Sequence, residues 1–322
     1  MEKNLTAGSH PSILFFGTPE FALPALDALI AEKYDMVGVV TNPDELFGRK
    51  QILTPPPVKV LAEKYSLSIF QPEKLKRELW DREIPTADLF VVAAYGKIIP
   101  KSILEIPTYG TLNIHPSLLP RWRGASPIQS AILAGDEDTG VTIMLVDKQM
   151  DHGPIVAHET LHIGDRKYTY LELHDQLAQR GAKLLIEAIP PWVSGAITPT
   201  PQDDTKATYC AMLQKEDGRI DWKKSAEEIE RMARAYNPWP STWTTWSAPD
   251  RIYRIRIDKA DLILDGLPIG SPGLVWQKEK ALLVQTGMGS IEIGRATLEG
   301  KKPMSGAELL RGYPQLVGAM LV

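Results

Sequence analysis

The chain is poor in the features that mark secreted, membrane and nucleotide-cofactor proteins. Its 322 residues include one cysteine, Cys210, which cannot close a disulfide within the chain and fits a reducing compartment. Apolar residues make up 43% of the sequence, but no run of them is long enough to cross a bilayer. Residues 1–11 lack the apolar segment of a signal peptide. We therefore expect a cytoplasmic protein with no membrane contact.

The glycine-rich turn of dinucleotide-binding proteins is also missing. The first apolar run, residues 12–16, is followed by Gly17-Thr18-Pro19-Glu20. Pyrophosphate binding needs three glycines in the pattern G-x-G-x-x-G, so a nicotinamide cofactor is not expected. A tight turn from a strand into a helix explains this segment well enough.

Positive charge is scarce as well. The formal net charge is −4, from 36 Lys and Arg against 40 Asp and Glu. Residues 1–205 carry 19 Lys and Arg against 26 Asp and Glu, and residues 206–322 carry 17 against 14. The second part is therefore mildly basic, which permits a polyanionic partner. Ordinary variation between domains explains the difference equally well.

Apolar runs alternate with amphipathic segments up to residue 188. The runs predict strands at residues 12–16, 36–41, 88–93, 111–115, 141–146 and 155–163. Segments of helical periodicity predict helices at residues 20–30, 58–65, 126–134 and 168–188. This alternation is typical of an α/β fold whose mostly parallel sheet is covered by helices on both faces.

A proline-rich stretch ends this pattern. Among Ser, Thr, Gly and Asp residues lie Pro190, Pro191, Pro199 and Pro201. Such a composition is typical of a linker, and we expect the last helix to end before it. The predicted organisation is a first domain at residues 12–192, a linker at 193–208 and a smaller second domain at 209–322.

The second domain begins with one helix and continues with short strands. Ser225 and Glu228 have the spacing of a capping box at the start of a helix over residues 225–236. Strands are expected at residues 242–246, 252–257, 261–264, 274–276, 282–285 and 290–296. Short strands separated by Gly and Pro turns predict a small β-barrel.

The densest group of reactive side chains lies in residues 113–129, NIHPSLLPRWRGASPIQ. Asn113 and His115 are two positions apart on a predicted strand, so they share one face. Pro116 helps to end that strand, and ligands of open α/β sheets bind at the carboxyl ends of strands. Alternatively, the two side chains simply satisfy backbone groups of the loop.

Asp151 lies in a turn between two predicted strands. If residues 141–146 pair beside the Asn113 strand, its carboxylate reaches the same site. The three side chains suit acyl transfer to an amine, since a carboxylate or imidazole can take the ammonium proton while Asn113 and a protonated His115 stabilise the oxyanion. The amine attacks directly, so no Ser or Cys nucleophile is needed. The alternative is an aspartate that only caps its turn.

These motifs resemble those of the 10-formyltetrahydrofolate-dependent formyltransferases. The likeness rests on Asn113, His115, the run SLLPRWRGA at residues 117–125, and Asp151 before Gly153. The resemblance implies that Asn113, His115 and Asp151 are catalytic. It also implies a Rossmann-like catalytic domain, 10-formyltetrahydrofolate as the formyl donor, and no metal.

The resemblance further implies where the folate donor binds. The family's folate-binding segment is matched by Ser117, Leu118, Leu119 and Pro120. Tyr95 and Gly96, which follow a predicted strand, are expected to form another wall of the pocket. Tyr95 can equally be a packing residue.

Three segments resemble the branch of the family that formylates initiator methionyl-tRNA. They are FGTPEFA at residues 16–22, KEDGRIDW at 215–222 and AYNPWPSTW at 235–243. The resemblance spans residues 12–312 and implies a C-terminal OB-like barrel that binds tRNA, in an enzyme expected to be a monomer. The related enzyme that formylates glycinamide ribonucleotide has a single domain, which argues against that substrate.

Two sets of cations are candidates for tRNA contact. Within the loop at residues 42–57, which the resemblance places at the acceptor end of tRNA, Arg49 and Lys50 are expected to meet phosphates. This loop is less basic than the family pattern, and a surface loop with incidental charges is the alternative. In the barrel, Arg254 and Arg256 share one face of a strand, where a merely solvated face is the alternative.

Tryptophans are concentrated at the start of the predicted barrel, at Trp239, Trp243 and Trp246. Tryptophan side chains can stack on bases. At this density, and beside prolines, we expect them instead to pack the core of the second domain.

The expected reaction is formyl transfer from 10-formyltetrahydrofolate to the α-amino group of initiator methionyl-tRNA, in support of translation initiation. One alternative is a folate-dependent formyltransferase that acts on an amino-sugar nucleotide. Another is a non-catalytic RNA-binding protein. A comparison of acceptors separates the two enzymes, and folate-dependent turnover with a free amine excludes the binding protein.

Overall fold

The chain forms two compact units. The computed structural model describes residues 10–48, 51–264 and 270–322. Unit 1 comprises Met1–Pro127, Asp138–His162 and Leu173–Cys210, and unit 2 comprises Ile128–Glu137, Ile163–Glu172 and Ala211–Val322. In the described part of the chain, no helix is both long enough and apolar enough to span a membrane.

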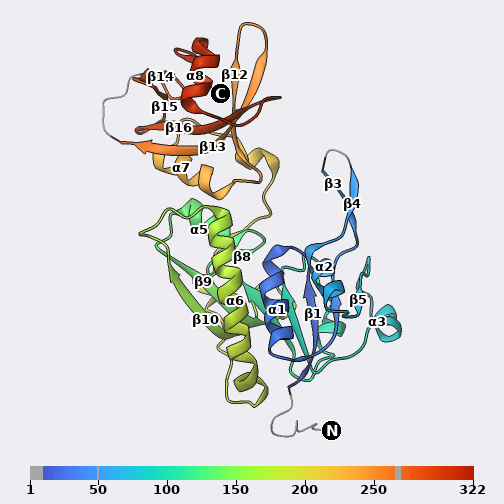
Figure 1. Ribbon diagram of the computed structural model, residues 1–322. Helices are drawn as coiled ribbons and strands as arrows, with labels where there is room; N and C mark the ends of the chain where they lie inside the picture. Colours follow the sequence, from blue (N-terminus) through green and yellow to red (C-terminus); the bar gives the residue numbers. More distant parts are fainter. Residues whose placement is uncertain (1–9, 49–50, 265–269) are drawn as a thin grey trace. The chain divides into compact units, whose positions relative to one another are not determined.

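Unit 1 is built on a seven-stranded sheet with the strand order β10-β9-β7-β6-β1-β2-β5 (Figure 1). From β5 to β7 in this order the neighbours are parallel, whereas β9 and β10 add antiparallel. The strands are β1 (Ser12–Gly17), β2 (Asp35–Val40), β5 (Ile69–Phe70), β6 (Leu89–Ala93), β7 (Thr111–His115), β9 (Asp138–Leu145) and β10 (Ile155–His162). The central strand β6 is buried along its whole length, because a strand in the middle of a covered sheet has no solvated face.

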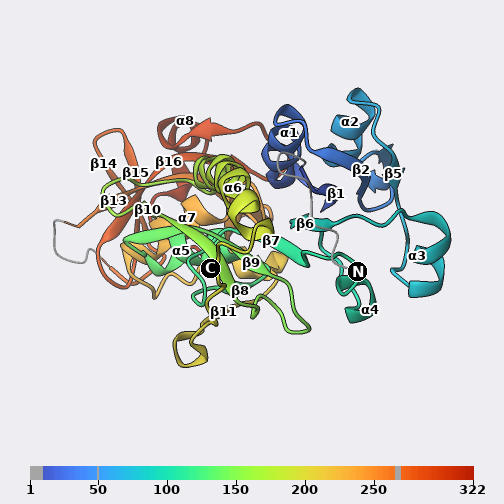
Figure 2. The same cartoon turned by 90° about the horizontal axis from the view of Figure 1, so that it is seen from below.

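Helices follow most of these strands. They are η1 (Glu20–Ala22), α1 (Leu23–Ala31), α2 (Pro57–Lys64), α3 (Arg77–Glu83), α4 (Lys101–Leu104), α5 (Pro127–Ala134) and α6 (Tyr170–Val193). Figure 1 and Figure 2 show α6 beside β9. A Cβ atom at Gly181 of α6 would lie 2.6 Å from Cγ2 of Ile114 and 3.2 Å from Cγ1 of Val141. The missing side chain therefore lets α6 approach β7 and β9 closely.

Every strand and helix predicted for the first domain is present, and the predicted α/β fold with a mostly parallel sheet is confirmed. The prediction that Pro190 and Pro191 lie beyond the last helix is wrong, because both belong to α6. Proline lacks an N–H, but its carbonyl still accepts. Here the carbonyls of Pro190 and Pro191 accept from the N–H groups of Ser194 and Ala196 at 3.1 and 2.8 Å, which ends the helix smoothly.

A hairpin occupies the stretch predicted as a loop after β2. Its strands are β3 (Glu45–Phe47) and β4 (Ile52–Thr54), paired antiparallel. Four large apolar side chains are exposed on it, namely Leu46, Phe47, Ile52 and Leu53. Figure 1 shows the hairpin extending away from the sheet of unit 1.

Unit 2 contains an antiparallel sheet with the order β12-β13-β16-β15-β14, and β17 pairs with β16. The strands are β12 (Thr242–Ser247), β13 (Ile252–Ile263), β14 (Val275–Lys278), β15 (Ala281–Gln285), β16 (Ser290–Leu298) and β17 (Met304–Ser305). The C-terminal segment bridges both edges, since Leu321 pairs with Trp246 and Met320 pairs with Leu274. The sheet is thus a half-barrel, flanked by α7 (Ala226–Ala235) and α8 (Gly306–Gly312).

Two predictions for the second domain need correction. The strands expected at residues 252–257 and 261–264 form the single strand β13, whose register shifts around Lys259. Such a bulge interrupts the alternation of apolar residues, and the sequence pattern therefore looks like two strands. Trp243 and Trp246 are buried as expected, but Trp239 is 53% exposed, and its assignment to the core is wrong.

Candidate active site

Asn113 and His115 lie near the carboxyl end of β7, which runs between β6 and β9 in the sheet of unit 1. Asn113 is half-buried, and His115 is 4% exposed. Among the described residues, no group hydrogen-bonds the side-chain amide of Asn113. The Asn113 amide is therefore available to a ligand, whereas His115 is fixed by its surroundings.

His115 is held by a backbone carbonyl, and this bond determines its tautomer. Nε2 of His115 lies 2.9 Å from the carbonyl oxygen of Trp122. A carbonyl only accepts, so Nε2 carries the hydrogen and donates it. Nδ1 of the neutral ring then has a free lone pair, and it faces Oδ1 of Asp151 at 3.7 Å.

Asp151 lies in the turn between β9 and β10 and adopts a left-handed backbone conformation with φ of 49°. Aspartate tolerates this region better than most residues. Its Oδ2 accepts the backbone N–H of Gly124 at 2.8 Å, which leaves Oδ1 toward His115. The structure thus brings Asp151 to His115 and places Asn113 on the same strand face as His115.

The segment expected to bind folate forms a compact turn after β7. Thr142 on β9 donates its hydroxyl to the Ser117 carbonyl at 2.7 Å and accepts the Leu119 N–H at 3.2 Å. Ser117 is fully buried and donates its own hydroxyl to the carbonyl of Arg121 at 2.6 Å. Leu118 and Pro120 are only half-buried. The apolar side chains of Leu118 and Pro120 are therefore the part of this segment that a ligand can reach.

Gly124 lets the end of this turn approach a second strand. Residues Arg123–Gly124 form β8, which pairs in parallel with β11 (Tyr209–Cys210). The φ of Gly124 is 121°, and a Cβ atom there would lie 2.1 Å from the carbonyl oxygen of Cys210. Only glycine fits this position, and it brings the N–H that Asp151 accepts.

Tyr95 and Gly96 follow β6. The ring of Tyr95 packs in the core against Phe16, 5.5 Å between centroids, and its buried hydroxyl has no partner among the described residues. Burial raises the pKa of Tyr95 to about 12. Gly96 has a φ of 81° and open space where a Cβ atom would lie, and Ile98 beyond it is 89% exposed. The backbone at Gly96 and the side chain of Ile98, which was not predicted as a site residue, are open to a ligand.

The cations expected to contact tRNA differ in their surroundings. Arg49 and Lys50 lie outside the described residues. On β13 the guanidinium of Arg254 lies 3.4 Å from the ring centroid of Trp243, and Nε of Arg256 donates to Asp258 at 2.5 Å. Both side chains lie on the strand face opposite the buried Ile255 and Ile257, as the alternation predicts.

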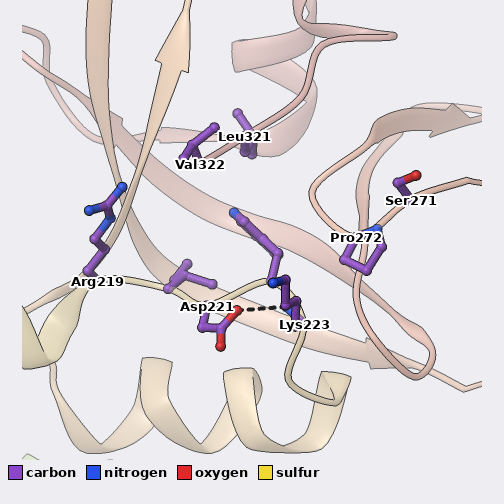
Figure 3. Close-up of a pocket in the computed structure, with 9 residues that line it drawn as sticks. Arg219, Asp221, Lys223, Ser271, Pro272, Leu321 and Val322 are labelled. Atoms are coloured by element: carbon purple, nitrogen blue, oxygen red, sulfur yellow. Dashed lines mark hydrogen bonds between the residues drawn. The ribbon is translucent and has the colours of Figure 1, made fainter.

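A cavity in unit 2 contains none of the predicted catalytic residues. It has a volume of about 530 Å³, and Figure 3 shows Arg219 and Lys223 at its edge. Asp221 accepts the backbone N–H of Lys223 at 3.0 Å there. The described part of the chain contains no group of three His, Cys, Asp or Glu side chains arranged to hold a metal ion.

Comparison with protein families identifies the fold and the chemistry. A formyl transferase model matches residues 12–189, and a model of the formyl transferase C-terminal domain matches residues 212–314. The chain belongs to the formyl transferase family. The first match contains Asn113, His115 and Asp151, and the second begins where unit 2 takes over the chain.

Curated formyl transferases are similar to the chain over almost its whole length. Methionyl-tRNA formyltransferase from Chloroflexus aurantiacus is 45% identical over 304 residues, which cover 93% of this chain and 96% of the relative. The enzyme of the same name from Marinobacter nauticus is 44% identical and covers 95% of this chain and 97% of its own. Both domains are therefore included in the likeness.

A solved formyl transferase shares the fold at lower identity. The N-formyltransferase from Helicobacter canadensis, crystallised with folinic acid and dTDP-3-aminofucose, has a TM-score of 0.64 and 18% identity. The match covers 87% of this chain and 98% of that one. At this identity the likeness concerns the fold alone.

Proposed function

We propose that this formyl transferase moves the formyl group of 10-formyltetrahydrofolate to the α-amino group of initiator methionyl-tRNA. The choice of methionyl-tRNA as acceptor rests on the curated methionyl-tRNA formyltransferases, which are similar to the chain across both domains. The chemistry rests on one observation, that Nδ1 of His115 faces the Asp151 carboxylate on the strand face that carries the Asn113 amide.

In this proposal His115 and Asp151 manage the proton of the amine. An α-ammonium group must lose a proton before its nitrogen can attack a carbonyl carbon. Nδ1 of His115 can accept this proton, because the hydrogen on Nε2 is committed to the carbonyl of Trp122. Asp151 then faces an imidazolium and stabilises its charge.

Asn113 stabilises the charge that develops on the formyl oxygen. Its side-chain NH₂ group provides two donors, and neither is used by another described residue. A preorganised donor of this kind lowers the barrier of acyl transfer more effectively than water does, because it does not need to reorient. His115 in its charged form adds a second stabilising group near the same position, and it gives its proton to the folate nitrogen when the bond between that nitrogen and the formyl carbon breaks.

The residues at the carboxyl ends of β6 and β7 fit a folate as donor. When bound, the donor supplies the formyl group. The exposed Ile98 and the half-buried Leu118 and Pro120 offer apolar contacts to a flat ring system, and the open space at Gly96 lets a ligand approach the backbone. A folate ring system has no pyrophosphate, so the missing phosphate-binding glycines after β1 are compatible with this donor.

The remaining assignments concern the tRNA. The proposal divides the chain into a catalytic domain at residues 12–192, a linker at 193–208 and a tRNA-binding domain at 209–322. Arg49 and Lys50 contact phosphates near the reacting amino acid, and Arg254 and Arg256 contact phosphates elsewhere on the tRNA. The exposed apolar side chains of the β3–β4 hairpin suit contact with unpaired bases rather than with phosphates.

A comparison of two acceptors tests the proposal. Purified protein is supplied with 10-formyltetrahydrofolate and either methionyl-tRNA or a dTDP-linked amino sugar, and formylated product is measured. We expect turnover only with methionyl-tRNA, and we expect His115→Ala to abolish it while the far-UV spectrum stays unchanged. Turnover confined to the amino sugar would replace the proposed acceptor, and near-normal turnover of the His115 variant would overturn the mechanism.

A further inference from the structure

Gln202 holds the turn that carries Asp151. Its side-chain Nε2 donates to the carbonyl of Asp151 at 2.9 Å and to the carbonyl of Gly153 at 2.7 Å. The two hydrogens of one amide thus bridge the backbone on either side of His152. The turn connects β9 to β10 and includes the left-handed residue Asp151.

Arg123 in turn fixes Gln202. Oε1 of Gln202 accepts Nε–H of Arg123 at 3.0 Å, so the orientation of the amide is determined and its NH₂ group must point toward the turn. The side chain of Arg123 is 2% exposed, and its NH2 nitrogen pairs with Asp204 at 2.7 Å. This hydrogen bond holds the pKa of Asp204 below its ordinary value, so the carboxylate remains ionised opposite Arg123 at neutral pH.

The segment Trp122–Gly124 contacts His115, Gln202 and Asp151. The carbonyl of Trp122 accepts from His115, and the N–H of Gly124 donates to Oδ2 of Asp151. Between these two, Arg123 holds Gln202 through its side chain. His115, the Trp122–Gly124 segment, Gln202 and Asp151 therefore form a closed ring of contacts, and Gln202 is its only member from the proline-rich stretch after α6.

We propose that Gln202 is a positioning residue for formyl transfer, which rests on the proposed role of Asp151. By holding the carbonyls of Asp151 and Gly153, it keeps Oδ1 of Asp151 toward Nδ1 of His115. Gln202 acts through Asp151 and does not touch the reacting groups. Loss of its two donated hydrogen bonds therefore lowers kcat and leaves the KM values for donor and tRNA nearly unchanged.

Gln202→Glu is the main test variant. The substitution keeps the shape of the side chain and its acceptor for Arg123, but it replaces the donating NH₂ group with an oxygen that faces two carbonyls. Groups that orient a reactive residue typically change rates by about 10-fold to 100-fold, and we expect a fall in kcat of that order. Gln202→Met, which cannot donate but carries no charge, provides a second variant if the first folds poorly.

Gln285→Glu is a matched control in unit 2. There the side-chain amide also donates to two backbone carbonyls, those of Thr286 at 3.0 Å and Gly289 at 2.8 Å. We expect this change to lower the melting temperature. At temperatures where the variant is still folded, its kcat should equal that of the wild type. If both Gln202 variants lose stability but keep wild-type kcat, Gln202 is only structural and the proposal is wrong.

A double-mutant cycle with Asp151→Asn decides whether Gln202 works through Asp151. If it does, Gln202→Glu reduces kcat by less than about twofold in the Asp151→Asn background, since the positioned charge is already lost. Equal reductions in both backgrounds overturn the proposal. Absence of wild-type turnover with either acceptor overturns the proposed function and this inference together, whereas wild-type turnover with an unaffected Gln202→Glu variant overturns this inference alone.

Discussion

Nδ1 of His115 and Oδ1 of Asp151 lie 3.7 Å apart, while the opposite nitrogen of the ring and the opposite oxygen of the carboxylate are each bound to backbone. The carbonyl of Trp122 accepts the hydrogen bond from Nε2–H, and the N–H of Gly124 donates to Oδ2. The two facing atoms are therefore the ones left for chemistry. Oδ2 of Asp151 has a structural role, whereas Oδ1 faces His115. A substitution that removes the charge but keeps an accepting oxygen therefore tests the charge alone.

Asp151→Asn is expected to lower kcat by about a hundredfold to ten-thousandfold, because an amide cannot stabilise an imidazolium. The fold should survive, since asparagine tolerates a positive φ and its oxygen can still accept the N–H of Gly124. Steady-state formyl transfer and thermal melting, measured on the same preparation, check both parts. Asp147→Asn is the control, because Asp147 pairs with His152 at 2.6 Å rather than with His115. Equal losses from both variants would contradict a specific role for the Asp151 charge.

Gly124→Ala is expected to damage stability and activity together. The new Cβ atom would lie 2.1 Å from the carbonyl oxygen of Cys210, and alanine is strained at a φ of 121°. We expect the free energy of unfolding to fall by about 2–4 kcal/mol, measured by urea titration. Gly195→Ala provides the comparison, since Gly195 has a φ of 74° but no atom within 4 Å of the added carbon. That variant should lose only about 1 kcal/mol and keep its activity.

The strand that carries Asn113 and His115 could be predicted residue by residue. In β7, Leu112 and Ile114 alternate with polar residues, and the strand is bounded by Gly110 and Pro116, so that both of its ends agree with the prediction. The condition under which Asp151 was expected to reach this strand is met, because β7 and β9 are paired. The period-two pattern and the breakers at its ends contain this information locally, so one sequence is enough.

The groups that fix Asp151 could not be predicted in the same way. Gln202 lies in a stretch whose Pro, Ser and Thr content is typical of a linker, and its partner carbonyls at Asp151 and Gly153 are 51 and 49 positions away. Backbone carbonyls have no sequence signature, and nothing near Gln202 indicates where it binds. The pairing of β8 with β11 was missed for the same reason, since each strand has two residues.

Tyr95→Phe tests whether the Tyr95 hydroxyl binds the donor or only packs. Burial raises the pKa of Tyr95 to about 12. In the unfolded chain the phenol ionises near pH 10, while the folded protein keeps the proton, so stability falls between about pH 10 and 12. The variant lacks this loss and should gain stability relative to wild type across that range, as urea unfolding at several pH values can show. An unchanged KM for the folate donor would assign Tyr95 to packing, whereas a tenfold higher KM would assign it to the pocket.

The capping box of α7 gives a pH prediction of the opposite sign. Glu228 accepts the backbone N–H of Ser225 at 2.9 Å, and this hydrogen bond, followed by the one from the Ser225 hydroxyl, lowers the pKa of Glu228 below its ordinary value of 4.5. The stabilisation is therefore present above pH 4.5 and is lost as the pH falls through the lowered pKa. Ser225→Ala should cost about 1 kcal/mol at pH 7, and the difference from wild type should shrink in acid. A difference that is constant from pH 7 to pH 3 would contradict the contribution of the hydrogen bond that the Ser225 hydroxyl donates to the Glu228 carboxylate.

The β3–β4 hairpin gives a prediction about the acceptor. Phe47 is 75% exposed and Leu46 is 60% exposed, although large apolar side chains are costly to leave in water. If they meet unpaired bases of the tRNA, Phe47→Ala should raise the KM for methionyl-tRNA by about tenfold, because stacking is worth about 1–3 kcal/mol per base. The melting temperature should stay the same, since the side chain is hardly buried. Arg49→Ala should also raise this KM, and its effect should fade at high salt because it removes a phosphate contact. Val60→Ala is the control, an exposed apolar residue of α2 outside the hairpin. If Phe47→Ala and Val60→Ala give the same KM, the hairpin does not bind the acceptor.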